Sequence, residues 1–327
     1  MSLNVRLLLA FFAIYVVWGS TYLAIRLAVE TIPPLATAGV RHLTAGLILY
    51  VWARGWQARV TWTEWRASIV VAVLFFLIGH GTLHWAEQIV PSGIAALLVA
   101  TEPLWIAMLM PGEQASRWSP RVIGGLAAGL IGVGLLVPQE AFATGSSQLV
   151  GGSAILLGAM SWAFGVWYSA TAPLPKDPFV RAATTLLCGA ALLLAASAIT
   201  GEMTQVDLGA ISTRSLLGLS YLIVFGSVVA FSAYTWLLER CPATLVATHT
   251  YVNPVIAVLL GWLFAGERLT PRVIGATGLI LAAVLLLKSS TAQRRTQSGE
   301  GLCPPPDARA DRVGAYGGGF RVPSGRD

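Results

Sequence analysis

The chain has 327 residues, of which 56% are hydrophobic and only 11% are charged. Soluble chains carry roughly 25% charged residues, so this composition excludes an ordinary soluble protein. The formal net charge of +6 needs no nucleic-acid partner to explain it, because membrane proteins gather Lys and Arg in loops on one side of the bilayer. Three cysteines, Cys188, Cys241 and Cys303, lack metal-ligand spacing and predict no disulfide framework.

Apolar stretches of membrane-spanning length follow one another along most of the chain. A bilayer core about 30 Å thick needs roughly 20 apolar residues per helix. Long continuous runs favour helices over the alternating strands of a barrel, and the first run is too long for a signal peptide. We therefore expect an all-α integral membrane protein with ten transmembrane helices, near residues 7–28, 35–53, 67–87, 92–110, 121–137, 149–170, 179–199, 215–238, 243–264 and 272–288.

The second half of the chain repeats the first. The stretch from Trp85 to Val137 recurs without a gap as Trp236 to Lys288, at a constant shift of 151 residues and with 15 identities in 53 positions. A weaker match at a shift of 144 residues superposes Trp18 on Trp162. The pattern predicts two five-helix repeats, residues 1–138 and 139–288. Residues 289–327 are rich in Gly, Pro, Ser, Arg and Asp and predict a disordered tail.

Charge distribution predicts how the chain sits in the membrane. With the N-terminus in the cytoplasm, the inner loops and ends carry twelve Lys or Arg residues and the outer loops carry four. This bias favours cytoplasmic N- and C-termini. Because five spans per half is an odd number, the second half enters the membrane the other way up. We therefore expect inverted repeats, with a binding site near the bilayer midplane between them.

Several short motifs resemble those of EamA-type transporters, a family of the drug/metabolite transporter superfamily. The motifs are Trp18-Gly-Ser-Thr-Tyr22, Ile32-Pro-Pro34, Trp85-Ala-Glu-Gln88, Thr101-Glu-Pro-Leu-Trp105 and Gly266-Glu-Arg-Leu-Thr-Pro271. The resemblance covers about residues 7–288. It implies movement of small metabolites across a bacterial cytoplasmic membrane, and many relatives export amino acids or related compounds. Two departures stand out: the Gly-Glu-Arg motif is altered at residues 112–117, and Glu102 stands where many members are uncharged.

Glu102 is the foremost candidate site residue. It falls in the middle of the fourth span, and a charged side chain there costs about 3 kcal/mol or more unless it faces the bundle interior. It could titrate with protons, since burial disfavours its charged form, or it could pair with an amine-bearing cargo. Pro103 follows it, and Asn253 with Pro254 occupies the equivalent place in the ninth span. Matching helix breaks in two halves indicate a midplane site, although a structural carboxyl and a tolerated kink remain alternatives.

Other polar residues within the spans are weaker candidates. Arg41 lies about two turns inside the second span, where it could attract a carboxylate, pair with Glu102, or extend to the outer headgroups. His80 and His84 are four residues apart on one helical face. They fit pore-facing polar groups or helix–helix hydrogen bonds better than a metal site, and His42 and His249 have the same simple interpretation. Trp18, Tyr22 and Trp162 could form aromatic walls of a pocket, with core packing as the alternative.

These features together predict a secondary transporter that moves a small organic metabolite across the membrane by alternating access. From the resemblance we expect an amino acid or related compound, export, and the inner membrane of a bacterium. We expect no enzyme activity and no cofactor. A membrane-embedded enzyme using His80, His84 and Glu102 stays open as an alternative, as does a sensor or scaffold. Protons and a second copy of the chain are candidate partners beside the cargo and the lipid bilayer.

Overall fold

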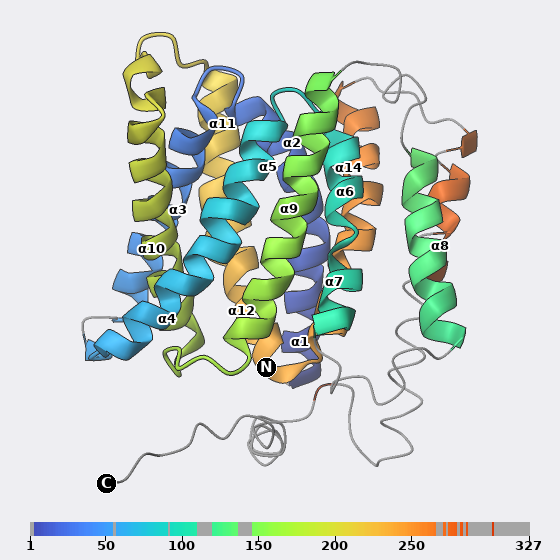
Figure 1. The fold of residues 1–327 in the computed structure, drawn as a ribbon, viewed down its shortest axis with the longest axis horizontal. Coiled ribbons are helices and arrows are strands. Elements are labelled where there is room, and N and C mark those ends of the chain that lie inside the picture. The colour runs from blue at the N-terminus through green and yellow to red at the C-terminus, as the bar shows by residue number, and fades with distance from the viewer. Residues whose placement is uncertain are drawn as a thin grey trace, which may run out of the picture.

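The computed structural model describes residues 3–54, 57–90, 92–109, 120–136, 146–265, 271–272, 274–279, 282–283, 286 and 303. Every regular element within these ranges is helical, and the helices run side by side as one bundle (Figure 1). Five helices are long and apolar enough to cross a membrane: Leu3–Ala28, Trp62–Ala86, Leu149–Ser169, Pro178–Ile199 and Thr213–Arg240. The all-α membrane fold expected from the sequence is confirmed.

The first half of the chain forms the first five spans. They are α1 (Leu3–Phe12) with η1 (Ala13–Val17) and α2 (Trp18–Ala28); α3 (Pro34–Trp52); α4 (Trp62–Ala72) with η3 (Val73–His80) and α5 (Gly81–Ala86); α6 (Ser92–Val99) with α7 (Glu102–Leu109); and α8 (Pro120–Leu136).

The second half continues with four further spans. They are α9 (Ser146–Ser169); α10 (Pro178–Ile199); α11 (Thr213–Tyr221) with η7 (Leu222–Val229) and α12 (Ala230–Arg240); and α13 (Ala243–Val246) with α14 (His249–Ala265). A short 3₁₀-helix, η6 (Glu202–Gln205), follows α10. The expected tenth span, 272–288, is described only in part, at residues 272, 274–279, 282–283 and 286. The altered segment 112–117, the motif 266–270 and the tail apart from Cys303 lie outside the described residues.

Local signals explain where several helices begin. At the start of α10, the Asp177 side chain accepts hydrogen bonds from the backbone N–H groups of Phe179 and Val180, at 2.8 and 3.0 Å. Pro178 occupies the first helical position, where its missing N–H costs nothing. At the start of α4, Thr61 and Glu64 form a reciprocal capping box. These caps fix the ends of spans that hydropathy alone leaves uncertain by a few residues.

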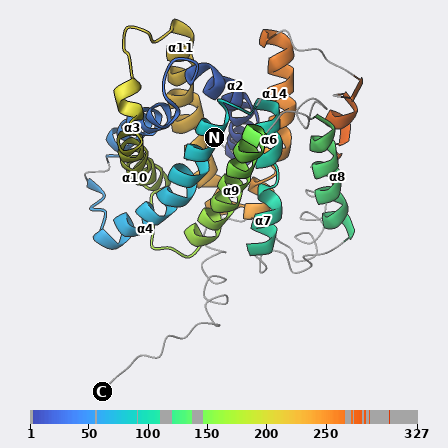
Figure 2. The same ribbon diagram turned by 45° about the horizontal axis from the view of Figure 1, so that its top comes forward.

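Helices α3 and α10, which are repeat-related, form a close pair at one edge of the bundle (Figure 2). Two glycines of α3 make this approach possible. A Cβ on Gly39 would meet the side chain of Leu194 at 2.7 Å, and one on Gly46 would meet Leu187 at 3.0 Å. Small residues let membrane helices pack backbone to side chain in this way. At the other edge, α8 lies beside α6 and α14 (Figures 1 and 2).

Two π-helical segments occupy equivalent places in the two halves, η3 in the third span and η7 in the eighth. A π-helix displaces the regular i→i−4 bonding and leaves carbonyls available for other donors. In η3 the carbonyl of Leu74 accepts a hydrogen bond from Ser161 of α9 at 2.9 Å. In η7 the carbonyl of Gly226 accepts one from the Trp18 indole of α2 at 2.9 Å. The first helix of each half is thus bonded to the third helix of the other.

Two sequence-based expectations differ from the structure. The fourth span breaks at Ala100 and Thr101, directly before Glu102, but the ninth breaks at residues 247–248 and α14 runs through Pro254. The expected absence of disulfides is wrong, because Cys241 and Cys303 are joined across a Cα–Cα distance of 4.5 Å. Cys241 is the C-cap residue of α12, just before α13, and the spacing of the cysteines in the sequence could not pair it with Cys303.

Candidate functional site

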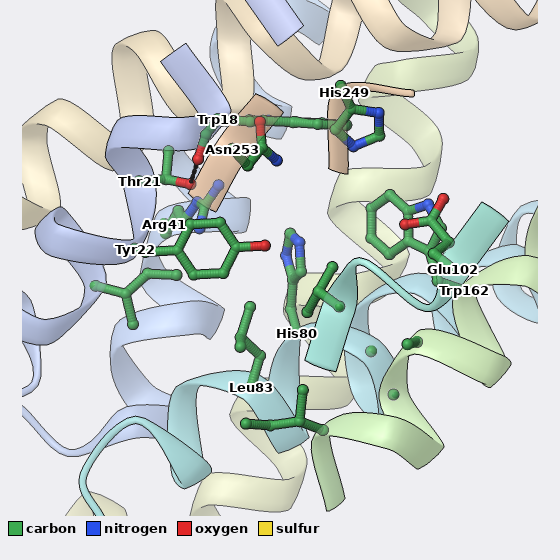
Figure 3. Close-up of a pocket in the computed structure, with 16 residues that line it drawn as sticks. Trp18, Thr21, Tyr22, Arg41, His80, Leu83, Glu102, Trp162, His249 and Asn253 are labelled. Atoms are coloured by element: carbon green, nitrogen blue, oxygen red, sulfur yellow. Dashed lines mark hydrogen bonds between the residues drawn. The ribbon is translucent and has the colours of Figure 1, made fainter. Parts of the chain in front are cut away.

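One cavity lies where spans of both halves meet (Figure 3). Its volume of about 70 Å³ has room for several water molecules, each of which needs roughly 10–15 Å³ by this measure. The walls come from the first, second, third, fourth, sixth and ninth spans. The predicted site residues that line it are Trp18, Tyr22, Arg41, His80, Glu102, Trp162 and Asn253.

Aromatic rings form one side of the cavity. Trp18 and Trp162 meet edge to face with ring centroids 6.0 Å apart. Their indole N–H groups are both satisfied elsewhere, Trp18 on the Gly226 carbonyl and Trp162 on the Tyr234 hydroxyl at 2.8 Å. Because the polar atoms of both rings are already bonded, the rings offer the cavity apolar and π-electron surface. Such a surface suits an apolar side chain or a cation.

Glu102 and Asn253 bring unsatisfied acceptors to the cavity. Glu102 is the first residue of α7 and only 2% exposed, and its Oε1 has no hydrogen-bond partner among the described residues. Asn253 is also 2% exposed, and its buried Oδ1 likewise has no hydrogen-bond partner among the described residues. A buried polar atom without a partner costs about 1–3 kcal/mol. A ligand that donates hydrogen bonds to these oxygens would recover that cost.

Arg41 is buried as well, with an exposed fraction of 2%. Its Nε donates to the Ser227 hydroxyl of η7 at 2.7 Å. Its terminal nitrogens have no hydrogen-bond or ion-pair partner in the described part of the chain, so Arg41 is not paired with Glu102 and does not extend to the membrane surface. Gly226 makes room for the guanidinium, since a Cβ there would meet Nη2 of Arg41 at 2.9 Å.

The four histidines are organised more closely than the sequence indicated. His42 Nε2 lies 2.9 Å from His80 Nδ1, joining α3 to η3. His80 stacks on Trp162 with centroids 5.2 Å apart and lines the cavity. His84 is fully buried outside the cavity lining, and its Nδ1 bonds to the His80 carbonyl at 2.7 Å. His80, His84 and Glu102 therefore do not converge on one point, as the alternative enzyme site would require.

Two further polar residues lie near the site: His249, which the sequence analysis did not place in the cavity, and Glu87, which it did not single out. His249 lines the cavity beside Trp18, with ring centroids 4.9 Å apart. Glu87 caps α5 and is 3% exposed, and neither of its carboxyl oxygens has a partner among the described residues. Glu87 interacts electrostatically with Arg26 and Arg41. Its place in the Trp85-Ala-Glu-Gln88 motif was the available signal, but a carboxylate at the end of a predicted span is ordinarily solvated.

The arrangement separates two kinds of binding group. Arg41 offers N–H donors and positive charge from α3, whereas Glu102 and Asn253 offer acceptors from α7 and α14. In the view of Figure 3, His80 lies between Arg41 and Glu102. A guanidinium matches the geometry of a carboxylate, and a carboxylate attracts an ammonium group. The cavity is therefore chemically suited to a small zwitterion with an apolar side chain.

Comparisons with known proteins agree with the fold. Over 286 residues the chain is 38% identical to YedA of Escherichia coli strain K12, which is named an inner membrane transporter; the match covers 85% of this chain and 89% of YedA. The transporter YoaV of Bacillus subtilis strain 168 is 24% identical, with 89% of this chain and 99% of YoaV covered. A solved crystal structure matches the fold with a TM-score of 0.68 at 22% identity, covering 90% of this chain and 99% of the other.

The model of one family matches the chain twice, at residues 6–137 and 149–289. These two matches account for most of the chain and fall on its two halves. The fold of ten membrane helices in two repeats and the transport of small molecules are properties of that family. The chain belongs to the EamA-like transporter family of the drug/metabolite transporter superfamily.

Proposed function

We propose that the protein is a secondary transporter for a small zwitterionic metabolite, an amino acid or a close relative, and that it works by alternating access. The observation that supports this most strongly is that hydrogen-bond donors and acceptors without partners among the described residues line the same cavity. Among the described residues, the terminal guanidinium nitrogens of Arg41 and one buried side-chain oxygen each of Glu102 and Asn253 have no hydrogen-bond partner. Hydrogen-bond donors on one side of a small cavity and acceptors on another favour a cargo that can both accept and donate hydrogen bonds.

The carboxylate of the cargo would bind Arg41. Nε is already held by Ser227, so the two terminal nitrogens remain, and each can donate hydrogen bonds. The Ser227 bond also fixes the plane of the guanidinium, which reduces the entropy lost when a carboxylate binds. Charge-assisted hydrogen bonds of this kind are roughly twice as strong as neutral ones. Arg41 would therefore select an anionic group.

The ammonium group of the cargo would bind at Glu102 and Asn253, and the aromatic rings of Trp18 and Trp162 would hold its side chain. Glu102 takes part in no ion pair among the described residues. A buried carboxyl in that position is more stable when protonated. Glu102 would therefore exchange a proton for an ammonium group, which would couple cargo movement to protons.

Alternating access would come from rocking of the two halves about the cavity. The bonds from α2 to η7 and from α9 to η3 link each half to the other at repeat-related places. We infer an inner-membrane protein with both termini in the cytoplasm, from the twelve-to-four charge count and the name of the E. coli relative. From the family resemblance we propose that the protein exports its cargo. In the cell, the gradients of cargo and protons determine the direction of net transport.

The test uses purified protein in lipid vesicles loaded with unlabelled amino acids or amines. Entry of the labelled compound by exchange is followed with and without a pH gradient. We expect exchange of at least one zwitterion, with Glu102→Ala and Trp18→Ala each lowering its rate about tenfold or more. Arg66→Ala, an exposed charge on α4, serves as a control. If Glu102→Ala and Trp18→Ala both exchange every compound as fast as the wild type does, the cavity is not the binding site.

A further inference from the structure

Three ring-to-carbonyl hydrogen bonds fix where the protons of the histidines lie. A backbone carbonyl can only accept a hydrogen bond, so any imidazole nitrogen bonded to one must carry a proton. Nδ1 of His42 bonds to the carbonyl of Ala38, and Nδ1 of His249 bonds to that of Val246 at 2.9 Å. Nδ1 of His84 bonds to the carbonyl of His80. Each of these rings is therefore an Nδ1–H tautomer when it is neutral.

Neutral imidazoles follow from the surroundings. His42 is fully buried, and the guanidinium of Arg41 interacts electrostatically with His42, His80 and His84. A second positive charge beside this guanidinium, away from water, would be costly. His42 therefore has its only proton on Nδ1, and its Nε2 can only accept a hydrogen bond.

That constraint passes from His42 to His80. His42 Nε2 lies 2.9 Å from His80 Nδ1, so His80 must supply the proton of this bond from Nδ1. A neutral His80 then has no proton on Nε2. Figure 3 shows the His80 ring directed into the cavity, and its Nε2 has no hydrogen-bond partner among the described residues. The ring itself is held by stacking on Trp162.

We propose that His42 is a positioning residue that locks His80 as the Nδ1–H tautomer, so that His80 Nε2 is an obligate hydrogen-bond acceptor for the cargo. The cargo group that meets it must donate, as an ammonium, amide or hydroxyl group does, and a group with only lone pairs is rejected because two acceptors repel. This inference deepens the proposed transport function and rests on the cavity being its site. The lock itself is a property of the protein alone.

The test is ¹⁵N NMR of the full chain, labelled with ¹⁵N-histidine and reconstituted in lipid nanodiscs. The chain has 4 histidines, so single substitutions assign every ring. In the wild type we expect the His80 signal to show a protonated Nδ1 and an unprotonated Nε2. In His42→Phe, which keeps a ring beside Phe76, the Nδ1–H form should lose its dominance and a protonated Nε2 should appear.

Two further variants separate the lock from general packing. His42→Gln can offer a carbonyl oxygen to His80 Nδ1, so it should restore the Nδ1–H form. His84→Phe keeps a ring 5.8 Å from the His80 ring but removes the hydrogen bond to the His80 backbone carbonyl. It leaves the His42–His80 bond in place, so it should leave the His80 tautomer unchanged. The His249 signal reports in every variant whether the fold is intact.

A wild-type His80 that is protonated on Nε2, alone or on both nitrogens, would overturn the inference, and this result needs no variant to fold. So would an unchanged tautomer in His42→Phe. The outcome is independent of the vesicle assay. A locked His80 in a protein that exchanges no tested compound would contradict the proposed function and leave the lock standing.

Discussion

Trp18 and Trp162, which occupy equivalent places in the two halves, meet edge to face with ring centroids 6.0 Å apart. Both rings line the cavity, together with Arg41 and Glu102, so the two halves of the chain meet at its wall. The two indoles are not bonded alike, since one donates to a backbone carbonyl and the other to a tyrosine hydroxyl.

Trp18→Phe should destabilise the bundle. The change keeps an aromatic ring but removes the N–H that satisfies the Gly226 carbonyl in η7. We expect a loss of about 1 kcal/mol in the free energy of unfolding. Equilibrium unfolding in mixed micelles measures it, with Trp62→Phe as the control because Trp62 is 70% exposed. Equal unfolding midpoints for the two variants would mean that the Trp18–Gly226 hydrogen bond contributes nothing to the stability of the fold.

Arg41→Lys should lower exchange of compounds that carry a carboxylate by about tenfold or more. A lysine keeps the charge but cannot bond Ser227 and present a planar pair of donors at the same time. Exchange of amines without a carboxylate should change much less. The measurement is vesicle exchange of matched amino acids and amines, with Arg66→Lys as the control. An equal loss for both compound classes would indicate general disruption and not carboxylate recognition.

Gly226→Ala should impair transport while the protein stays folded. The added Cβ would stand 2.9 Å from Nη2 of Arg41 and 3.0 Å from Cγ2 of Thr21, so the guanidinium must move away from its position. A displacement of about 1 Å at a binding group can lower a rate about a hundredfold. Gly124→Ala is the matched control, because a Cβ there meets no atom within 4 Å. Wild-type exchange by Gly226→Ala would show that the position of Arg41 is unimportant.

Glu102→Gln should remove the pH dependence of exchange. Glutamine has nearly the same shape as a protonated glutamic acid, but it cannot release a proton or offer a charge to an ammonium group. We expect the variant to exchange zwitterions slowly and at a rate that no longer varies with pH. The measurement is a series of exchange rates at fixed internal and external pH. A variant with wild-type rates and the same pH profile would exclude Glu102 from coupling.

Much of the fold was predictable from hydropathy, because the bilayer sets the length of each span. The predicted seventh span, 179–199, differs by one residue from α10, Pro178–Ile199. The π-segments η3 and η7 were not predictable, because in a helix that is apolar on all sides the sequence carries no periodic signal to reveal a change of pitch. The break at residues 247–248 was missed for a related reason. Pro254 was the more obvious signal, yet a proline within a membrane helix is tolerated.

Polarity within the spans identified several residues that line the cavity, but it could not predict the contacts between them. Charge and polarity within a span singled out Glu102 and Arg41, since such groups must face the interior. The bond between His42 and His80 joins residues 38 positions apart and depends on how α3 packs against η3. Burial of Glu87 likewise depends on tertiary packing. A single sequence contains neither piece of information.

The proposed function requires the cavity to bind a zwitterion by both of its charges. The most direct measurement compares vesicle exchange of an amino acid with that of its decarboxylated amine and its deaminated acid, using the sets based on phenylalanine and alanine. We expect that, in at least one set, the amino acid exchanges about tenfold faster than either partial compound. Arg41→Lys and Glu102→Gln should each abolish this preference. Equal exchange of all three compounds in both sets, or an amino-acid preference that survives both substitutions, would contradict it.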